Sequence, residues 1–148
     1  MQYSQALPDF LKRPNIESVR LIPYRDPRGI MTAGVGHKLT SRDPTGPWTM
    51  DMVLAQLALD LDATQSQVNA ALDGTELTQC EFDAVCSFTF NLGIKRFAGS
   101  TLLMLLKKGD IQGAADEFPR WDHDGGLVIP GLRTRRMLER AMFLGQPY

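Results

Sequence analysis

The stretch that organises this chain is Glu17–His37, with the sequence ESVRLIPYRDPRGIMTAGVGH. Its residue pattern predicts four local elements in order: a helix end over residues 17–20, a strand over 20–26, a tight turn at Pro27–Gly29 and a returning strand over 30–35. A hairpin of this kind folds Asp26 and Thr32 back toward the helix end that carries Glu17. We therefore expect two carboxylates and a hydroxyl group to face one cleft.

Two carboxylates and a hydroxyl group in one cleft are suited to the hydrolysis of a glycosidic bond. One carboxyl group, kept protonated in a partly apolar setting, donates a proton to the leaving oxygen, and an ionised one activates a water or stabilises the positive sugar ring. A threonine hydroxyl both donates and accepts, so it can orient that water. By chemistry alone, surface charges flanking a hairpin are the commoner explanation of a Glu and an Asp nine residues apart.

The pattern Glu17-x8-Asp26-x5-Thr32, followed by a Gly-x-Gly-His run that ends at His37, resembles a known catalytic signature. It is similar to that of the phage-type lysozymes, the endolysins of glycoside hydrolase family 24. The resemblance implies that Glu17 is the general acid. It also implies that Asp26 and Thr32 place the attacking water.

Two positions depart from the family pattern. Ser18 stands where the family usually has glycine, and Ala33 stands where it usually has isoleucine. Neither change removes a catalytic atom. Ser18 is expected to affect how the preceding helix ends, and hence the direction in which Glu17 points.

The resemblance also implies structural partners for the site. Asp60 lies in a stretch similar to the one whose aspartate pairs with the family histidine, so we expect an Asp60–His37 pair that ties the hairpin to the next helix. Relatives carry an arginine close to the catalytic glutamate, and Arg133 or Arg136 is expected to take that place. An adjacent cation favours the ionised form of Glu17, so burial of Glu17 has to outweigh it in an acid catalyst.

Three residues are expected to bind substrate by the same resemblance, namely Lys38, Phe90 and Ser100. Phe90 lies in residues 82–93, FDAVCSFTFNLG, which resemble the second motif of the family. From the pattern alone its aromatic residues belong to the core, whereas the family places Phe90 at the back of the cleft. Ser100 is also a suitable helix N-cap, so both roles are expected of it. A third family motif covers residues 128–139.

Helix-start and helix-end signals outline the rest of the chain. Thr49 is a plausible N-cap, Thr78-x-x-Glu81 is a capping box, and Gly93 suits a C-cap. Pro14 is expected to kink the first helix or to begin a short second one. The predicted helices cover residues 4–13, 50–72, 79–92, 101–108, 111–121 and a last segment up to about 144. Residues 38–48 are expected to form a loop, with or without one short strand, and residues 122–126 a loop.

Composition narrows the classes of protein. A chain of 148 residues with 43% hydrophobic residues predicts one domain with a sizeable core. The net charge of −1 gives no electrostatic reason to expect a nucleic-acid partner. Four arginines crowd the C-terminal segment, where they form either a solvated helix face or a surface that attracts an anionic polymer such as cell wall. These are Arg133, Arg135, Arg136 and Arg140.

The two cysteines are expected to be reduced thiols. Cys80 and Cys86 lie six residues apart in one predicted helix, point in different directions and are too distant to bridge. Cys86 falls on an apolar face and is predicted to be core. The scattered His and Cys residues predict no metal site, and the resemblance implies no cofactor.

The expected partner is the glycan strand of peptidoglycan, and nothing calls for an oligomer. No apolar run approaches transmembrane length and the chain has no signal-peptide pattern, so stable membrane insertion is not expected. The resemblance implies synthesis in the cytoplasm of a bacterial host, with release to the cell wall through a separate pore protein.

These observations predict an α+β, mainly helical, lysozyme-like fold. A small lobe over about 15–56 is joined by a long helix to a helical lobe over about 57–148, which also takes the N-terminal helix. The expected reaction is hydrolysis of the β-1,4 bond between N-acetylmuramic acid and N-acetylglucosamine, with inversion. The alternatives are an inactive binding or scaffold module, which only Ser18 favours, and a lytic transglycosylase, which Asp26 and Thr32 disfavour.

Overall fold

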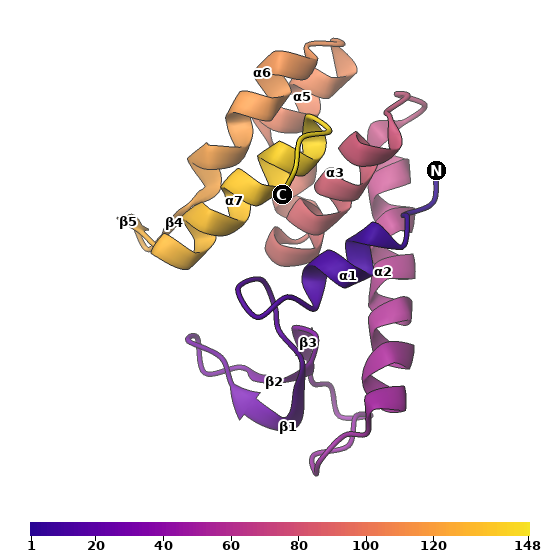
Figure 1. Ribbon diagram of the computed structural model, residues 1–148, viewed down its shortest axis with the longest axis vertical. Helices are drawn as coiled ribbons and strands as arrows, with labels where there is room; N and C mark the ends of the chain where they lie inside the picture. Colours follow the sequence, from indigo (N-terminus) through magenta and orange to yellow (C-terminus); the bar gives the residue numbers. More distant parts are fainter.

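The computed structural model describes all residues 1–148 and places a small β-sheet beneath a larger group of helices (Figure 1). Its elements, in chain order, are α1 (Ala6–Leu11), β1 (Arg20–Arg25), β2 (Met31–Gly34), β3 (His37–Lys38), α2 (Met50–Leu72), α3 (Gln79–Leu92), α4 (Ile94–Ala98), α5 (Thr101–Lys107), α6 (Ile111–Glu117), the 3-10 helix η1 (Phe118–Trp121), β4 (His123–Asp124), β5 (Leu127–Val128) and α7 (Pro130–Phe143). This architecture confirms the predicted α+β, mainly helical fold.

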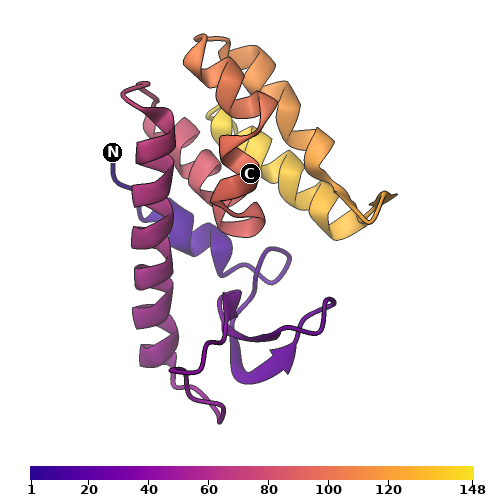
Figure 2. The ribbon, with the colours of Figure 1, turned by 180° about the vertical axis from the view of Figure 1, so that it is seen from behind.

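The long helix α2 runs along one side of the molecule and joins the sheet to the other helices, as opposite views show (Figures 1 and 2). Its start is fixed by Thr49, whose hydroxyl accepts a hydrogen bond from the backbone N–H of Met52 at 3.2 Å. Its end is fixed by Asp73, which takes a left-handed conformation with φ of 50°. Both ends lie where the sequence predicted them. One face is buried, through Val53, Leu57, Leu61, Thr64, Val68 and Leu72.

Helix α3 is the buried centre of the helical lobe. The capping box is confirmed: Thr78 and Glu81 each accept a hydrogen bond from the other's backbone N–H. All residues from Phe82 to Thr89 are buried, and the helix packs against α1, α2 and α7. Gly93 ends it at φ of 86°, as predicted.

The apolar core is continuous and extends into the small lobe. Trp48 is buried and belongs to the same cluster as the residues of α3. Cys86 is buried in this cluster, as predicted, and burial raises the pKa of its thiol, whereas Cys80 is exposed. The ring of Phe88 meets the edges of neighbouring aromatic rings, at centroid distances of 6.4 Å to Phe97 and 5.4 Å to Trp121.

The segment that carries Glu17 differs from the prediction. The first helix ends at Leu11, and neither the predicted kink nor a second short helix follows it; instead, residues 12–17 form successive turns. Pro14 has no N–H to donate and disfavours a helical conformation at the residue before it, which explains the early end. The backbone N–H of Glu17 bonds to the carbonyl of Leu11 at 3.2 Å, so the turns bring the chain back onto α1.

Four further elements were not predicted, namely α4, η1, β4 and β5. Residues 94–98 form the short helix α4, and the predicted helix over 111–121 is α6 followed by η1. The change to a 3-10 helix coincides with Pro119, which cannot donate an α-helical hydrogen bond. Residues 123–128 form the β4–β5 hairpin, because Gly125 and Gly126 both take positive φ, as a two-residue hairpin turn requires. None of the helices is long and apolar enough to cross a membrane.

Candidate active site

A cleft of about 850 Å³ opens between the sheet and the helical lobe. Glu17, Asp26 and Thr32 all line it, although they come from a turn, a hairpin turn and a strand. The opposite side of the cleft is formed by residues of α2, α3, α4, α7 and the β4–β5 hairpin. The structure therefore brings the three predicted catalytic residues together in one solvent-accessible cavity.

Glu17 is held against the backbone of Gly36. A Cβ atom at Gly36 would lie 2.6 Å from Oε2 of Glu17, and the residue also has φ of +66°. Only glycine meets both conditions, which gives the second glycine of the Gly-x-Gly-His run a physical role. Ser18, directly after Glu17, has φ of 62°. This is the left-handed region in which glycine is unstrained, so the usual glycine of the family matches the conformation found here.

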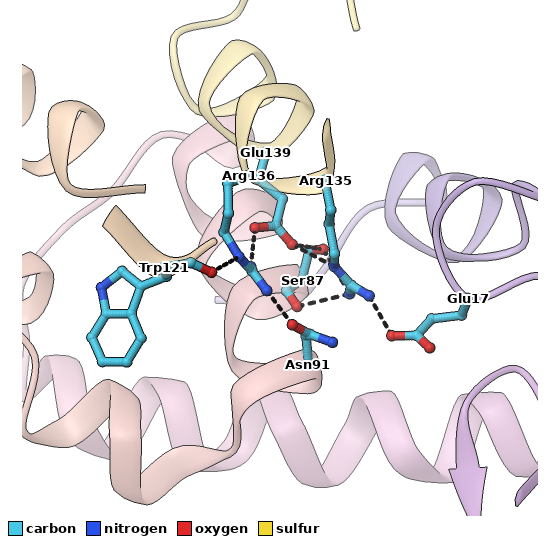
Figure 3. A network of polar contacts seen from close by, with 7 residues as sticks. All are labelled: Glu17, Ser87, Asn91, Trp121, Arg135, Arg136 and Glu139. Atoms are coloured by element: carbon cyan, nitrogen blue, oxygen red, sulfur yellow. Dashed lines mark hydrogen bonds and ion pairs between the residues drawn. The ribbon is translucent and has the colours of Figure 1, made fainter. Parts of the chain in front are cut away.

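The cation beside Glu17 is Arg135, so the prediction of Arg133 or Arg136 is wrong (Figure 3). The side chain of Arg135 is 3% exposed and its Nη1 donates to Oε1 of Glu17, which is 18% exposed. Helix α7 begins at Pro130, and its rotation turns Arg135 and Arg136 inward and Arg133 outward. Arg133 is exposed and does not line the cleft.

A buried carboxylate that sequence reasoning missed lies behind this pair. Glu139 is fully buried, and its oxygens accept hydrogen bonds from Nε of Arg135 at 2.9 Å and from Nη1 of Arg136. The hydroxyl of Ser87 donates to Oε1 of Glu139 at 2.7 Å. The signal in the sequence was Arg135-Arg136-x-x-Glu139, which places one carboxylate within reach of two arginines on a single helix.

The two arginines respond differently to burial. Burial lowers the pKa of Arg135, but the negative charges of Glu17 and Glu139 outweigh this effect and raise it above its usual value. Burial also lowers the pKa of Arg136, and the attraction of Glu139 only partly offsets it. Arg136 is further held by the side chain of Asn91 and by the carbonyl of Trp121 (Figure 3).

Asp26 is fixed by its own turn. Its Oδ1 accepts hydrogen bonds from the backbone N–H of Arg28 at 2.9 Å and of Ile30 at 2.8 Å. Such a turn is a usual site for aspartate, and it leaves Oδ2 without a protein hydrogen bond. Thr32 is 4% exposed, and its hydroxyl donates to the carbonyl of Ile30 at 3.0 Å. The lone pairs of that hydroxyl remain able to accept.

A row of side chains crosses the sheet beside these residues. Tyr24 on β1 is paired with Thr32 on β2, which is paired with Lys38 on β3. Directly paired residues share one face of a sheet, and all three line the cleft. Burial, and then the charge of Glu17, raise the pKa of Tyr24. Lys38, predicted to bind substrate, thus lies in the cleft.

The predicted pair between His37 and Asp60 is confirmed. Nδ1 of His37 lies 2.8 Å from Oδ2 of Asp60, whose Oδ1 accepts from Gln56 at 2.9 Å. The other ring nitrogen lies 3.3 Å from Oδ2 of Asp43, a second partner that the sequence did not reveal. Hydrogen bonds from Thr40, and then from His37, lower the pKa of Asp43. Together these contacts tie β3 to α2.

The remaining substrate-binding predictions have different outcomes. Phe90 lines the cleft and packs against the core, so it has a place in both interpretations made from the sequence. Ser100 caps α5, as expected, by accepting from the N–H of Leu103 at 3.1 Å, and it donates to the carbonyl of Phe97 at 2.7 Å. It is buried and does not line the cleft. No three His, Cys, Asp or Glu side chains are grouped to hold a metal ion.

An ion pair closes one side of the cleft mouth. Nη2 of Arg28, on the turn between β1 and β2, lies 2.8 Å from Oδ1 of Asp124, on the β4–β5 hairpin. Both turns project from the same side of the molecule (Figures 1 and 2). The two side chains are 55% and 47% exposed, so this contact between the lobes is surrounded by solvent.

Comparisons with known proteins identify the family of this chain. The phage lysozyme family model matches residues 14–139. An SAR-endolysin of Bacteriophage PS119 is 36% identical over 87% of this chain and 77% of its own length. A mutant of P22 lysozyme is 38% identical and superimposes with a TM-score of 0.81, over 97% of this chain and 99% of that one.

The agreement in structure extends over the whole molecule. The endolysin of Escherichia coli O157:H7 phage FAHEc1 superimposes with a TM-score of 0.88 and 29% identity, covering 100% of this chain and 98% of that one. The family match contains every residue of the proposed catalytic group and the buried ion network. The chain therefore belongs to the phage lysozyme family, whose members are glycoside hydrolases that act as endolysins on peptidoglycan and lyse the host cell.

Proposed function

We propose that this chain hydrolyses the β-1,4 bond between N-acetylmuramic acid and N-acetylglucosamine, with inversion at the anomeric carbon. The observation that carries the proposal is the convergence of Glu17, Asp26 and Thr32 on one cleft between the lobes. Inverting glycosidases need an acid and a base with room for a water between them. No cofactor takes part in this reaction.

Glu17 is the general acid in this mechanism. Its protonated carboxyl group gives its proton to the glycosidic oxygen as the bond to the anomeric carbon breaks. The carboxylate that forms is then stabilised by Arg135, which already donates to Oε1. Arg135 therefore acts on the charge that develops during the reaction, although it disfavours the protonated ground state.

Asp26 and Thr32 orient the attacking water. The hydroxyl proton of Thr32 is committed to Ile30, so Thr32 acts as an acceptor toward a water. Oδ2 of Asp26 has no protein partner and is the second acceptor. A water that donates to both acceptors directs its lone pairs away from them, toward the anomeric carbon, and Asp26 takes its proton as it attacks.

Lys38 and Phe90 are proposed to contact the saccharide, because both line the cleft. Ser100 is not assigned such a contact. We further propose that the chain works as a monomer and as one domain, with its small lobe over about residues 15–56. After synthesis in the host cytoplasm it reaches the wall through a separate pore protein.

Digestion of purified peptidoglycan, followed by mass spectrometry of the fragments, tests the reaction. Reducing muropeptides are expected from the wild type and none from folded Glu17→Gln, with the exposed Glu76→Gln as a matched control that keeps full activity. Anhydro fragments would identify a lytic transglycosylase instead, and no fragments from a folded wild type would identify an inactive module. NMR of the first product formed distinguishes inversion, which gives the α-anomer, from retention.

A further inference from the structure

Glu139 on α7 is a fully buried carboxylate, and its burial needs a physical explanation. Removing a carboxylate and its partners from water carries a large desolvation penalty, and apolar side chains of similar volume often stabilise a fold as well or better. Glu139 and Arg136 are both fully buried, and Arg135 is 3% exposed. The hydrogen-bonded chain of Arg136, Glu139 and Arg135 ends at Glu17, and of these four residues only Arg135 and Glu17 line the cleft (Figure 3).

The contacts of Glu139 fix the orientation of Arg135. Nε of Arg135 donates to Oε1 of Glu139 at 2.9 Å, and Nη2 donates to the carbonyl of Ser87 at 3.2 Å. With these two positions occupied, the planar guanidinium group directs Nη1 toward Glu17. The geometry of the pair at the cleft therefore depends on a residue that does not reach the cleft.

The charges of the same group set the potential at Glu17. Arg135 and Arg136 place two buried positive charges behind it, and Glu139 cancels one of them. Without that negative charge, Glu17 would face a net charge of two rather than one. A more positive environment favours the ionised form of a carboxyl group and thus depletes the protonated form that a general acid needs.

We propose that Glu139 is a positioning residue for the acid step, which orients Arg135 toward Glu17 and offsets one of the two buried positive charges behind it. The inference rests on the proposed role of Glu17 as general acid. Glu139 acts through Arg135 and does not contact the substrate.

Other charged and titratable groups also face Glu17, and Glu139→Gln removes none of them. Tyr24 and Arg136 interact with its charge, from β1 and α7. Asp26, His37, Lys38 and Asp60 line the same cleft from the hairpin, β3 and α2. A change in the pH dependence that follows substitution of Glu139 therefore reports the loss of its own charge and contacts.

The test is the pH profile of kcat/KM on soluble, uncross-linked glycan fragments. Glu139→Gln should move the alkaline limb of the profile to lower pH by about one unit, because the acid loses its proton more readily. Arg136→Gln should move it to higher pH. The double variant restores the net charge and should return the limb close to that of the wild type. It also serves as the folded variant if Glu139→Gln alone does not fold.

Two controls separate charge from structure. Ser87→Ala removes a hydrogen bond to Glu139 but no charge, so it should lower stability and leave the limb in place. Glu117→Gln removes a largely buried carboxylate that pairs with Arg120 outside the cleft, and it should also leave the limb in place. An unshifted limb in folded Glu139→Gln would overturn the inference. If Glu139→Gln does not fold, a double variant whose limb coincides with that of Arg136→Gln would overturn it. Activity remaining in Glu17→Gln would instead overturn the proposed acid.

Discussion

Two arginine–carboxylate pairs connect the lobes of this molecule across the cleft, and they differ in burial. At the base, Arg135 contacts Glu17 from a nearly fully buried position on α7. At the mouth, Arg28 contacts Asp124 between two exposed turns. A buried pair cannot be broken on one side without leaving an uncompensated charge, whereas an exposed pair exchanges its partner for water. The same chemistry thus gives a fixed contact at one end and a readily opened contact at the other.

Removing Arg135, at the base of the cleft, should give the largest effect on stability. Arg135→Met leaves Glu17 and Glu139 with one cation fewer, and we expect a loss of roughly 3–5 kcal/mol in the free energy of unfolding. Urea denaturation measures this loss, with exposed Arg133→Met on the same helix as the matched control. A loss below about 1 kcal/mol would show that the pair is not effectively buried.

The base contact can also be disturbed from the side of the sheet. Gly36→Ala places a methyl group 2.6 Å from Oε2 of Glu17 and strains a positive φ, so we expect a loss of kcat together with a destabilisation of about 1–3 kcal/mol. Gly29→Ala has a similar φ but open space around it, and it should give backbone strain without loss of kcat. Equal kcat values in the two variants would contradict the close-contact argument.

A smaller effect of opposite sign is expected at Ser18. Ser18→Gly relieves a left-handed conformation next to Glu17, and the expected gain is about 1 kcal/mol in the free energy of unfolding. Thermal unfolding of the two proteins at one pH measures it. Because the backbone conformation is retained, the contact between Glu17 and Arg135 should persist, and a fall in stability would show that Ser18 makes compensating contacts.

The mouth pair should give the smallest effect. A double-mutant cycle of Arg28→Ala and Asp124→Ala is expected to give a coupling energy below about 1 kcal/mol. The coupling should decrease further as the salt concentration rises, because exposed charges are screened. A coupling that is large and insensitive to salt would remove the distinction between mouth and base.

The contacts that the sequence revealed are those set by local chemistry or by the family motif. Thr49, Thr78 and Gly93 mark helix ends because capping depends on residues three or four positions apart. The motif supplied Glu17 and the pairing of His37 with Asp60. These features do not depend on how distant elements are rotated against each other.

The missed contacts depend on tertiary geometry. Which arginine of α7 contacts Glu17 is decided by where the helix begins and how it is rotated against α3, and the sequence pattern does not reveal this rotation. The pair at the mouth joins residues 96 positions apart on two turns. The β4–β5 hairpin has strands of two residues each, which are too short to show an alternating pattern in the sequence.

The exposed bridge between Arg28 and Asp124 also bears on how a polymer enters the enzyme. Glycan strands in a cross-linked wall offer few free ends, so an enzyme that had to be threaded would reach few bonds. A bridge worth less than about 1 kcal/mol leaves the unbridged arrangement populated in a substantial fraction of molecules. On the proposed function, opening this bridge frees the cleft mouth on one side, and the contact of Glu17 with Arg135 at the base does not depend on it.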